Sequence, residues 1–259
     1  MLRFKNLGSG STGNATVVEG ARGTQVSRLL VDCGFGIRQL QSRLELAALS
    51  IEDIDAVFIT HEHSDHVGCA QKLAVRYGIP VWMSAGTHAA LGAPDLGEWL
   101  RVARDMEPID LATFTALPFT VPHDAREPLQ LRCSDGTASL CVMTDLGHAS
   151  DHVLRQLEGC HALMIEANHD PDLLAASSYP TFLKRRVGGR FGHLANAASA
   201  DIVRAVRHDG LQCVVAAHLS ARNNAPALAR QALSEALGWA EERVAVADPL
   251  DGTDWLSVG

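Results

Sequence analysis

The chain has 259 residues, of which 47% are hydrophobic and 20% charged, and this composition excludes an intrinsically disordered, collagen-like or coiled-coil protein. Its apolar runs are far shorter than the roughly 18 residues that a membrane-spanning helix needs, so we expect a globular protein with no membrane partner. The formal net charge of −8 argues against nucleic-acid binding through overall charge, but it leaves room for a local basic site.

Short strands separated by Gly-rich turns are predicted at the start of the chain, at Leu2–Leu7, Ala15–Glu19 and Ser27–Asp32. A helix is predicted over Ile37–Leu49, where apolar residues recur on one face. The apolar, β-branched run Ala56–Thr60 predicts a buried strand, and a helix is predicted after it, over Val67–Tyr77.

Strands and helices alternate in the rest of the chain. Helices are predicted over Leu194–His208 and Ala225–Leu237. Strands are predicted at Phe114–Val121, Pro128–Cys133, Ala138–Thr144, Ala162–Glu166, Gln212–Ala217, Val244–Val246 and Asp254–Val258. Interleaved strands and helices indicate a layered α/β fold. Because neither a repeat nor a long linker interrupts the sequence, we predict a single domain over residues 1–259.

The N-terminus and the cysteines indicate the compartment. The start of the chain lacks the apolar core of a signal peptide, so a cytoplasmic location is expected. The six cysteines are scattered and form no CxxC pair, which favours reduced thiols that lie mostly in the core.

A dense cluster of histidines follows the predicted strand at residues 56–60. The run Thr60-His61-Glu62-His63-Ser64-Asp65-His66 holds three imidazoles and two carboxylates. These side chains would not share one face of a helix or strand, but in a loop at a strand end they can converge. Imidazole and carboxylate groups suit zinc, manganese or iron, so the cluster predicts a metal site. The alternative is a solvated polar loop without a ligand.

The segment 58–68 resembles the HxHxDH signature of the metallo-β-lactamase superfamily. Further runs resemble the WalJ/YycJ-type branch of this superfamily, whose members are described as DNA exonucleases. These runs are Gly8 to Asn14, Val31 to Gly34, His123 to Ala125, Thr144 to His148, Glu166 to Asp170, Gly192 to Asn196 and Ala217 to Ser220. The resemblance covers nearly the whole chain and implies the four-layer αββα sandwich of the metallo-β-lactamase fold.

Carried over position by position, the resemblance implies a dinuclear centre of two divalent metal ions, with zinc, manganese or iron as the candidates. One ion would be held by His61, His63 and His123, and the other by Asp65, His66 and His218, with Asp145 as the bridge. Two neighbouring ions can share a hydroxide and stabilise both oxygens of a displacement. Asp32 is expected either to orient a ligand imidazole or to cap the turn that follows it.

The catalytic residues implied by the resemblance are Asp65, Glu166 and His193. His193, oriented by Glu166, would contact the scissile phosphate or protonate the departing oxygen. The alternative for His193 is that it caps the helix predicted from Leu194.

Candidate substrate-binding residues fall into two groups. His148, His169 and Asn196 belong to matched runs and are expected to line the pocket. Lys184, Arg185, Arg186 and Arg190 gather just before His193 and could contact phosphates, or they could form a solvated charged face.

The glycine-rich loop Gly8 to Asn14 mimics the spacing of a P-loop. Asn14 and Ala15 stand where a P-loop needs Lys followed by Ser or Thr, so binding of a nucleoside triphosphate is not supported. We expect a flexible turn beside the metal site instead.

One run departs from the branch pattern. After Glu127 and Pro128 the branch usually continues Val-Gly-Tyr, whereas this chain has Leu129-Gln130-Leu131. The departure leaves the implied ligands untouched and bears on the choice of substrate.

The sequence therefore predicts a metal-dependent hydrolase, a phosphodiesterase with 5′→3′ DNA exonuclease-like activity that uses a metal-bound hydroxide. Alternatives are hydrolysis of a small phosphodiester, thioester or lactone, and, from another class, a non-catalytic metal-binding protein. Nucleic acid or a small phosphodiester is the expected partner.

Overall fold

The computed structural model describes residues 1–259 and has two seven-stranded mixed sheets face to face. In order across the first sheet are β14 (Leu256–Val258), β1 (Leu2–Gly8), β2 (Ala15–Arg22), β3 (Gln25–Val31), β4 (Ala56–Phe58), β5 (Val81–Ser84) and β6 (Leu100–Ala103). The second sheet runs β13 (Val244–Val246), β12 (Cys213–Ala217), β11 (Ala162–Glu166), β10 (Ser139–Met143), β9 (Leu129–Ser134), β8 (Thr115–Thr120) and β7 (Ile109–Asp110).

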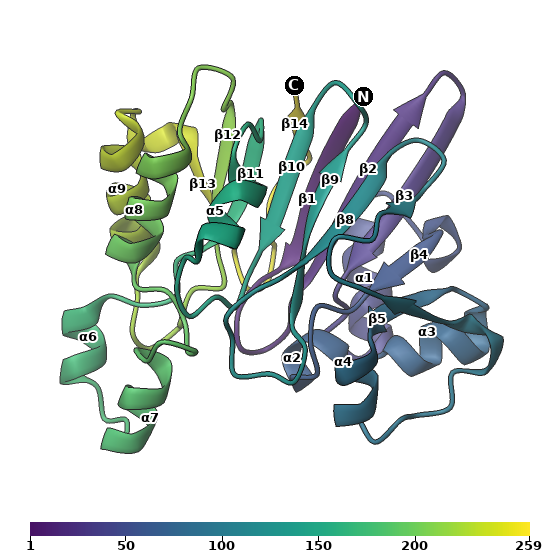
Figure 1. The fold of residues 1–259 in the computed structure, drawn as a ribbon, viewed down its shortest axis with the longest axis horizontal. Coiled ribbons are helices and arrows are strands. Elements are labelled where there is room, and N and C mark those ends of the chain that lie inside the picture. Colours follow the sequence, from purple (N-terminus) through teal and green to yellow (C-terminus); the bar gives the residue numbers. More distant parts are fainter.

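Helices cover the outer face of each sheet, so the molecule has four layers (Figure 1). On the first sheet lie α1 (Ile37–Leu46) and α3 (Ala70–Tyr77), and on the second α5 (Asp151–Leu157), α8 (Asn196–Val206) and α9 (Pro226–Leu237). The short helices are α2 (Ser64–Val67), α4 (Ala85–Ala90), α6 (Pro171–Ala176) and α7 (Thr181–Val187), with 3-10 turns at Ile51–Asp53, Gly97–Trp99 and Glu241–Arg243. The predicted αββα sandwich is confirmed.

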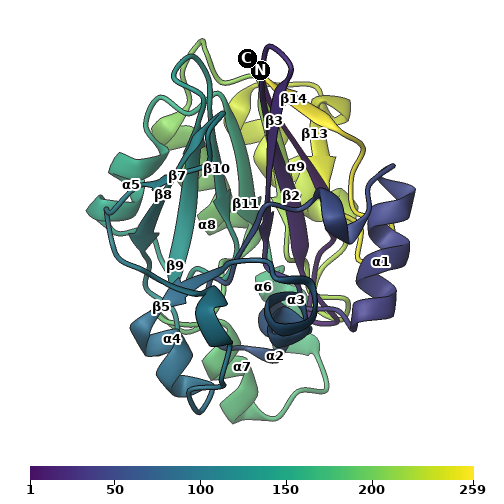
Figure 2. The same ribbon diagram turned by 90° about the vertical axis from the view of Figure 1, so that its right-hand side faces the viewer.

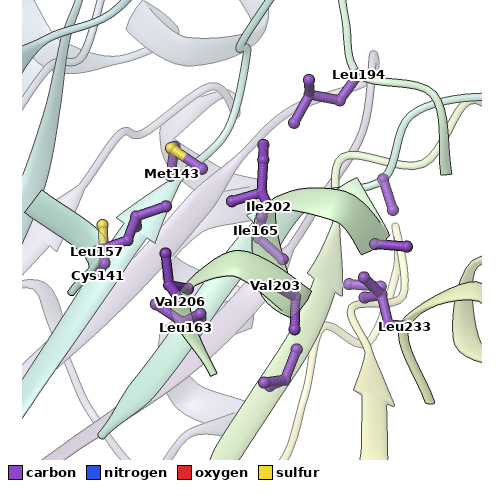
Figure 3. Close-up of a cluster of buried hydrophobic side chains, with 14 of the residues drawn as sticks. Cys141, Met143, Leu157, Leu163, Ile165, Leu194, Ile202, Val203, Val206 and Leu233 are labelled. Carbon is purple, nitrogen blue, oxygen red and sulfur yellow. The ribbon is translucent and has the colours of Figure 1, made fainter. Parts of the chain in front are cut away.

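Three buried clusters of similar size separate the four layers. One, of 23 residues, lies between the sheets, and clusters of 22 and 24 residues lie under the helices of the first and second sheet. In the last of these, Ile202 and Val206 of α8 lie over the side chains of β11 (Figure 3). Five of the six cysteines are buried, in line with the expected core positions. No helix is both long and apolar enough to cross a bilayer.

Most predicted elements form where the sequence placed them, and β11 and β13 have the predicted bounds. The helix predicted over Val67–Tyr77 is instead two helices, α2 and α3, which are separated at Gly68. Gly68 has φ +35°, and a Cβ at this position would lie 2.2 Å from the carbonyl oxygen of Cys33. The chain therefore turns here so that the segment after β3 can approach α2 closely.

The carboxyl ends of the parallel strands mark the functional edge of the sandwich. β3, β4 and β5 run parallel in the first sheet, as do β10, β11, β12 and β13 in the second. Helices α2, α6 and α7 lie beyond one edge of the sheets, opposite the two chain termini, in both views (Figures 1 and 2). The β4–α2 connection carries the histidine cluster to this edge.

Candidate active site

The site is assembled from residues at the ends of strands in both sheets. Asp32 follows β3, Asp145 lies two residues beyond β10, Glu166 ends β11 and His218 follows β12. Asp32, Asp145 and His218 have φ of 59°, 57° and 55°, a left-handed backbone that residues other than glycine seldom adopt. Such strain is typical of functional sites, where the turn aims a side chain into the site.

The three residues implied for one ion lie together. Nδ1 of His63 is 2.9 Å from Nε2 of His61 and 3.4 Å from Nε2 of His123. One ring nitrogen from each of these imidazoles lies within 4.8 Å of the others. His61 and His123 are buried and His63 is half-buried, so this nitrogen group opens toward solvent on the His63 side.

The three residues implied for the other ion also lie together. Oδ2 of Asp65 is 3.7 Å from Nε2 of His66 and 3.6 Å from Nε2 of His218. Asp145 lies between the two sets, because its Oδ2 is 3.0 Å from Nε2 of His66 and its Oδ1 is 3.9 Å from Nε2 of His123. The structure thus brings together all seven residues that the resemblance implied as ligands.

Four of the five imidazoles are anchored through Nδ1, and each is left with Nε2 facing the site. His66 Nδ1 lies 2.7 Å from Asp32 Oδ2, and His61 Nδ1 lies 3.0 Å from the Thr60 hydroxyl. His123 Nδ1 lies 3.1 Å from the Gly192 carbonyl oxygen, and His218 Nδ1 lies 2.8 Å from Glu166 Oε1. A hydrogen bond at one ring nitrogen fixes the tautomer that presents the other nitrogen to a metal.

Asp32 therefore orients an imidazole, which was one of its two predicted roles. Its carboxylate also accepts hydrogen bonds from the backbone N–H of Thr60, at 2.9 Å, and from the Thr60 hydroxyl. Since Thr60 contacts His61 as well, one buried carboxylate positions two neighbouring imidazoles.

The electrostatics of the cluster fit a bound cation. Nε2 of His218 and Oδ2 of Asp145 are buried and make no hydrogen bond, although buried polar atoms normally have a partner. Burial and the neighbouring His66 hold the pKa of His61 well below its usual range, which keeps its lone pair free. Burial opposes ionisation of Asp145, but His218 and His66 outweigh it and hold the pKa of Asp145 well below its usual range. Against burial, Asp145 in turn raises the pKa of His66 well above its usual range and, together with Asp65 and Glu166, raises the pKa of His218 to about 10. A divalent metal that binds these two rings would therefore displace their protons, and the ionised carboxylate and the imidazole nitrogens then form a suitable donor set.

Glu166 and His193 form a second pair at the site. His193 Nδ1 lies 2.8 Å from Glu166 Oε1. Burial disfavours a charged His193, yet the carboxylate of Glu166 outweighs burial and raises the pKa of His193 above its usual value. The alternative that His193 caps the following helix is wrong, because α8 begins after Ala195 and that N-cap has no side-chain hydrogen bond.

A cleft opens over these groups. His63, Asp65, Asp145, His193 and His218 form its floor. Arg186 is the only member of the predicted basic group that lines the cleft, and its Nε lies 2.6 Å from Asp124 Oδ2. Arg185 and Arg190 are exposed nearby in sequence, and the ammonium of Lys184 donates to the carbonyl oxygen of Ala175.

The three residues expected to line the pocket lie elsewhere. His169 and Asn196 are buried outside the cleft lining, because the backbone of His169 bridges to Ala195 and the amide of Asn196 pairs with Asn224. His148 Nδ1 lies 2.9 Å from the carbonyl oxygen of Arg190, and its ring packs near Phe191. The contacts of these three residues connect the loops around the site to one another.

Several site residues were missed by the sequence reasoning. Asn14, at the end of the glycine-rich loop, has Nδ2 3.2 Å from His66 Nε2 and donates its backbone N–H to the Asp65 carbonyl oxygen. This loop therefore lies beside the site, as expected. Asp124, next to a predicted ligand, lies in the run His123 to Ala125 and also lines the cleft. Ser220 also lines the cleft and ends the run Ala217 to Ser220, in which only His218 was given a role. Tyr179 and Asn223 line the cleft and carry no pattern that would have marked them.

Comparison with known proteins is consistent with this site. A family model described as "Beta-lactamase superfamily domain" matches residues 27–219. The chain is 34% identical over 245 residues to exodeoxyribonuclease YycJ of Bacillus anthracis, covering 91% of this chain and 89% of that protein. It is 32% identical over 255 residues to exodeoxyribonuclease WalJ of Streptococcus pneumoniae serotype 2 (strain D39), covering 95% of this chain and 91% of that protein.

Solved structures share the fold at low sequence identity. The metallo-β-lactamase fold protein YhfI of Bacillus subtilis superposes with a TM-score of 0.76 at 16% identity, over 99% of this chain and all of that one. Human tRNase Z, short form, superposes with a TM-score of 0.65 at 16% identity, over 100% of both chains.

Replacing Asp32 tests the anchoring of the imidazoles. Asp32→Asn keeps the size of the side chain and tolerates the left-handed backbone, but it removes the charge beside His66. We expect affinity for zinc or manganese to fall about 10- to 100-fold, measured by competition with a chelating dye. Asp55→Asn is the matched control, because Asp55 also accepts a backbone N–H, at 2.7 Å, and is exposed. Equal metal affinity in the two variants would contradict a positioning role for Asp32.

Proposed function

The chain belongs to the β-lactamase superfamily, and from this membership and the geometry of its site we propose that it is a dinuclear metal-dependent phosphodiesterase that degrades DNA. The observation that carries the proposal is the position of Asp145 between two groups of site-facing imidazole nitrogens. A single carboxylate between two donor sets suits a pair of neighbouring ions.

The donor sets are assigned as the resemblance implied. His61, His63 and His123 would hold one ion, and Asp65, His66 and His218 the other, with Asp145 contacting both. Zinc, manganese and iron all accept these nitrogen and oxygen ligands. When bound, two divalent ions would supply Lewis acidity, which acidifies water and neutralises charge on phosphate oxygens.

His193 would handle the proton of the leaving group. It lines the cleft, and its Nδ1 is held by Glu166, so Nε2 is the nitrogen left for substrate. Because the Glu166 carboxylate favours the protonated ring, Nε2 can donate a proton to the departing oxygen. Glu166 is then a positioning residue that keeps the ring in this orientation.

A nucleic-acid substrate is supported by the relatives and by charge. Both relatives described above are named exodeoxyribonucleases. The exposed Arg185 lies in α7 next to the cleft-lining Arg186, and the exposed Arg190 lies three residues after the end of this helix. These cations give an acidic protein a local contact surface for phosphates.

Removing ligands from both sets tests the proposed chemistry. Wild-type protein loaded with manganese or zinc should degrade labelled DNA, and His61→Ala plus Asp65→Ala should reduce this to background with loss of bound metal, measured by elemental analysis. His88→Ala plus Asp95→Ala is a control that removes the same residue types outside the site. Full activity in the first double variant would rule out metal-dependent hydrolysis at this site.

His193→Gln separates proton transfer from metal binding. We expect kcat on DNA to fall about 10²- to 10⁴-fold, the range for loss of a general acid, while the metal content stays unchanged. His161→Gln, at a half-buried histidine outside the cleft, should keep the wild-type kcat. A His193→Gln enzyme with wild-type kcat would show that another group protonates the leaving oxygen.

Salt dependence distinguishes a polyanion from a small ester. For wild-type protein log Kd for DNA should rise linearly with log salt concentration, and Arg185→Gln plus Arg190→Gln should lower the slope by about 1.4 to 1.8, for two lost phosphate contacts. Arg22→Gln plus Arg38→Gln makes the same change of net charge at exposed residues outside the cleft and should leave the slope unchanged. A salt-independent Kd in wild-type protein would favour a small uncharged ester instead.

A further inference from the structure

Helix α7 is unusual because none of its residues is buried in the core. An amphipathic helix normally buries its apolar stripe against other elements. The apolar residues Leu183 and Val187 of α7 are one helical turn apart and line the cleft instead. Tyr179, four residues before Leu183, lines the same cleft. The apolar side of this segment is therefore turned toward the substrate site.

The cleft is polar on its floor and apolar on one wall. Of its 15 lining residues only three are hydrophobic, and all three are the residues of this wall: Tyr179, Leu183 and Val187. The floor carries four of the seven predicted metal ligands, together with His193. A ligand that fills the cleft would thus meet charged and hydrogen-bonding groups on one side and an aromatic ring with two aliphatic side chains on the other.

Two guanidinium groups flank this wall. Arg186 lies between Leu183 and Val187 in sequence, lines the cleft and is held by Asp124 at 2.6 Å. The guanidinium carbon of Arg222, in the loop between β12 and α9, lies 6.0 Å from the ring centroid of Tyr179. Arg222 is exposed and directly precedes Asn223, which also lines the cleft. Cationic side chains therefore lie beside the apolar wall.

We propose that the wall of Tyr179, Leu183 and Val187 receives the base of an unpaired nucleotide next to the scissile phosphate. This inference rests on the proposed function. It adds that the DNA strand is unpaired at the nucleotide that enters the cleft. A nucleotide has the same asymmetry as the cleft: its phosphate suits the floor, its base suits the wall, and the flanking phosphates suit Arg186 and Arg222. Stacking on an aromatic side chain tolerates every base, because each base has a π-face.

Pairing of the strand would oppose this arrangement. A base in a duplex is already stacked and hydrogen-bonded, so its face is not free to meet Tyr179. Enzymes that need such a base must extrude it, at a cost of a few kcal/mol that is smallest for a mismatched or single-stranded nucleotide. The enzyme should therefore prefer unpaired ends to blunt duplex ends.

Binding measurements can isolate the contribution of the base. Manganese-loaded protein is titrated with two short single-stranded oligonucleotides of equal length and charge, made of phosphorothioates to resist hydrolysis. One carries bases and the other is abasic, and affinity is read from fluorescence anisotropy. Tyr179→Ala should weaken binding of the first about 5- to 150-fold, the range for loss of one stacked base, and leave the second within about twofold. Tyr179→Phe, which keeps the ring, should bind both as the wild type does.

Phe182→Ala is the matched control for Tyr179→Ala. Phe182 is an aromatic residue of the same helix, but it is 73% exposed and does not line the cleft. The Phe182→Ala protein should retain wild-type affinity for both oligonucleotides. In a parallel degradation assay, wild-type protein should cut a duplex with unpaired terminal nucleotides faster than a blunt duplex, and Tyr179→Ala should lose this preference.

The outcomes separate this inference from the proposed function. If the protein degrades DNA but Tyr179→Ala loses equal affinity for both oligonucleotides, or blunt and unpaired ends are cut equally fast, the wall does not receive a base. If wild-type protein with either metal neither binds nor degrades DNA, the proposed DNA phosphodiesterase is wrong. Loss of affinity confined to the base-bearing strand supports both.

Discussion

The buried carboxylate of Glu166 is the interaction on which the site depends. Its Oε2 accepts the backbone N–H groups of Leu146 and Leu194, at 2.9 and 3.0 Å, and its Oε1 lies 2.8 Å from Nδ1 of both His193 and His218. Burial opposes its ionisation, but His193 and His218 outweigh burial and lower its pKa to about 2. One charge at the end of β11 thus fixes the turns that follow β10 and β12 and the loop before α8. Removing it would leave two imidazoles and two N–H groups without their partner.

Periodicity and turn residues predict the layered core well, because burial of apolar faces is a local property of the sequence. The bounds of β11 and β13 follow directly from their short apolar runs. The break between α2 and α3 could not be predicted, since it depends on the close approach of Cys33 to Gly68 from a distant segment. Helices α6 and α7 were missed because they project beyond the sheets and bury little, so their sequence carries no strong apolar pattern.

The candidate ligands could be named from the sequence because the HxHxDH loop supplies four of them within one short segment. The other three come from separate strand ends, and only the resemblance marked Asp145. The backbone conformation that directs these side chains into the site could not be predicted from the sequence. Asp145 and His218 adopt a left-handed φ, which Asp and His seldom adopt. Proximity in sequence to a site residue also did not predict which side chains line the cleft. His169 lies three residues from Glu166, yet its ring is buried outside the cleft lining, whereas the unmarked Tyr179 reaches it.

The asymmetry of the cleft has a structural origin in the two kinds of element that meet there. The floor is built on the ends of sheet strands, where the carboxylates of Asp32 and Glu166 hold the imidazoles of His66 and His218 in one orientation. The wall is built on α7, which has no buried residue and is joined to the floor by the ion pair of Arg186 with Asp124. Because side chains on strand ends are positioned by the core and those on α7 are not, the floor suits chemistry that needs fixed geometry. The wall is free of that constraint, so its side chains can be replaced without disturbing the hydrogen bonds that position the residues of the floor.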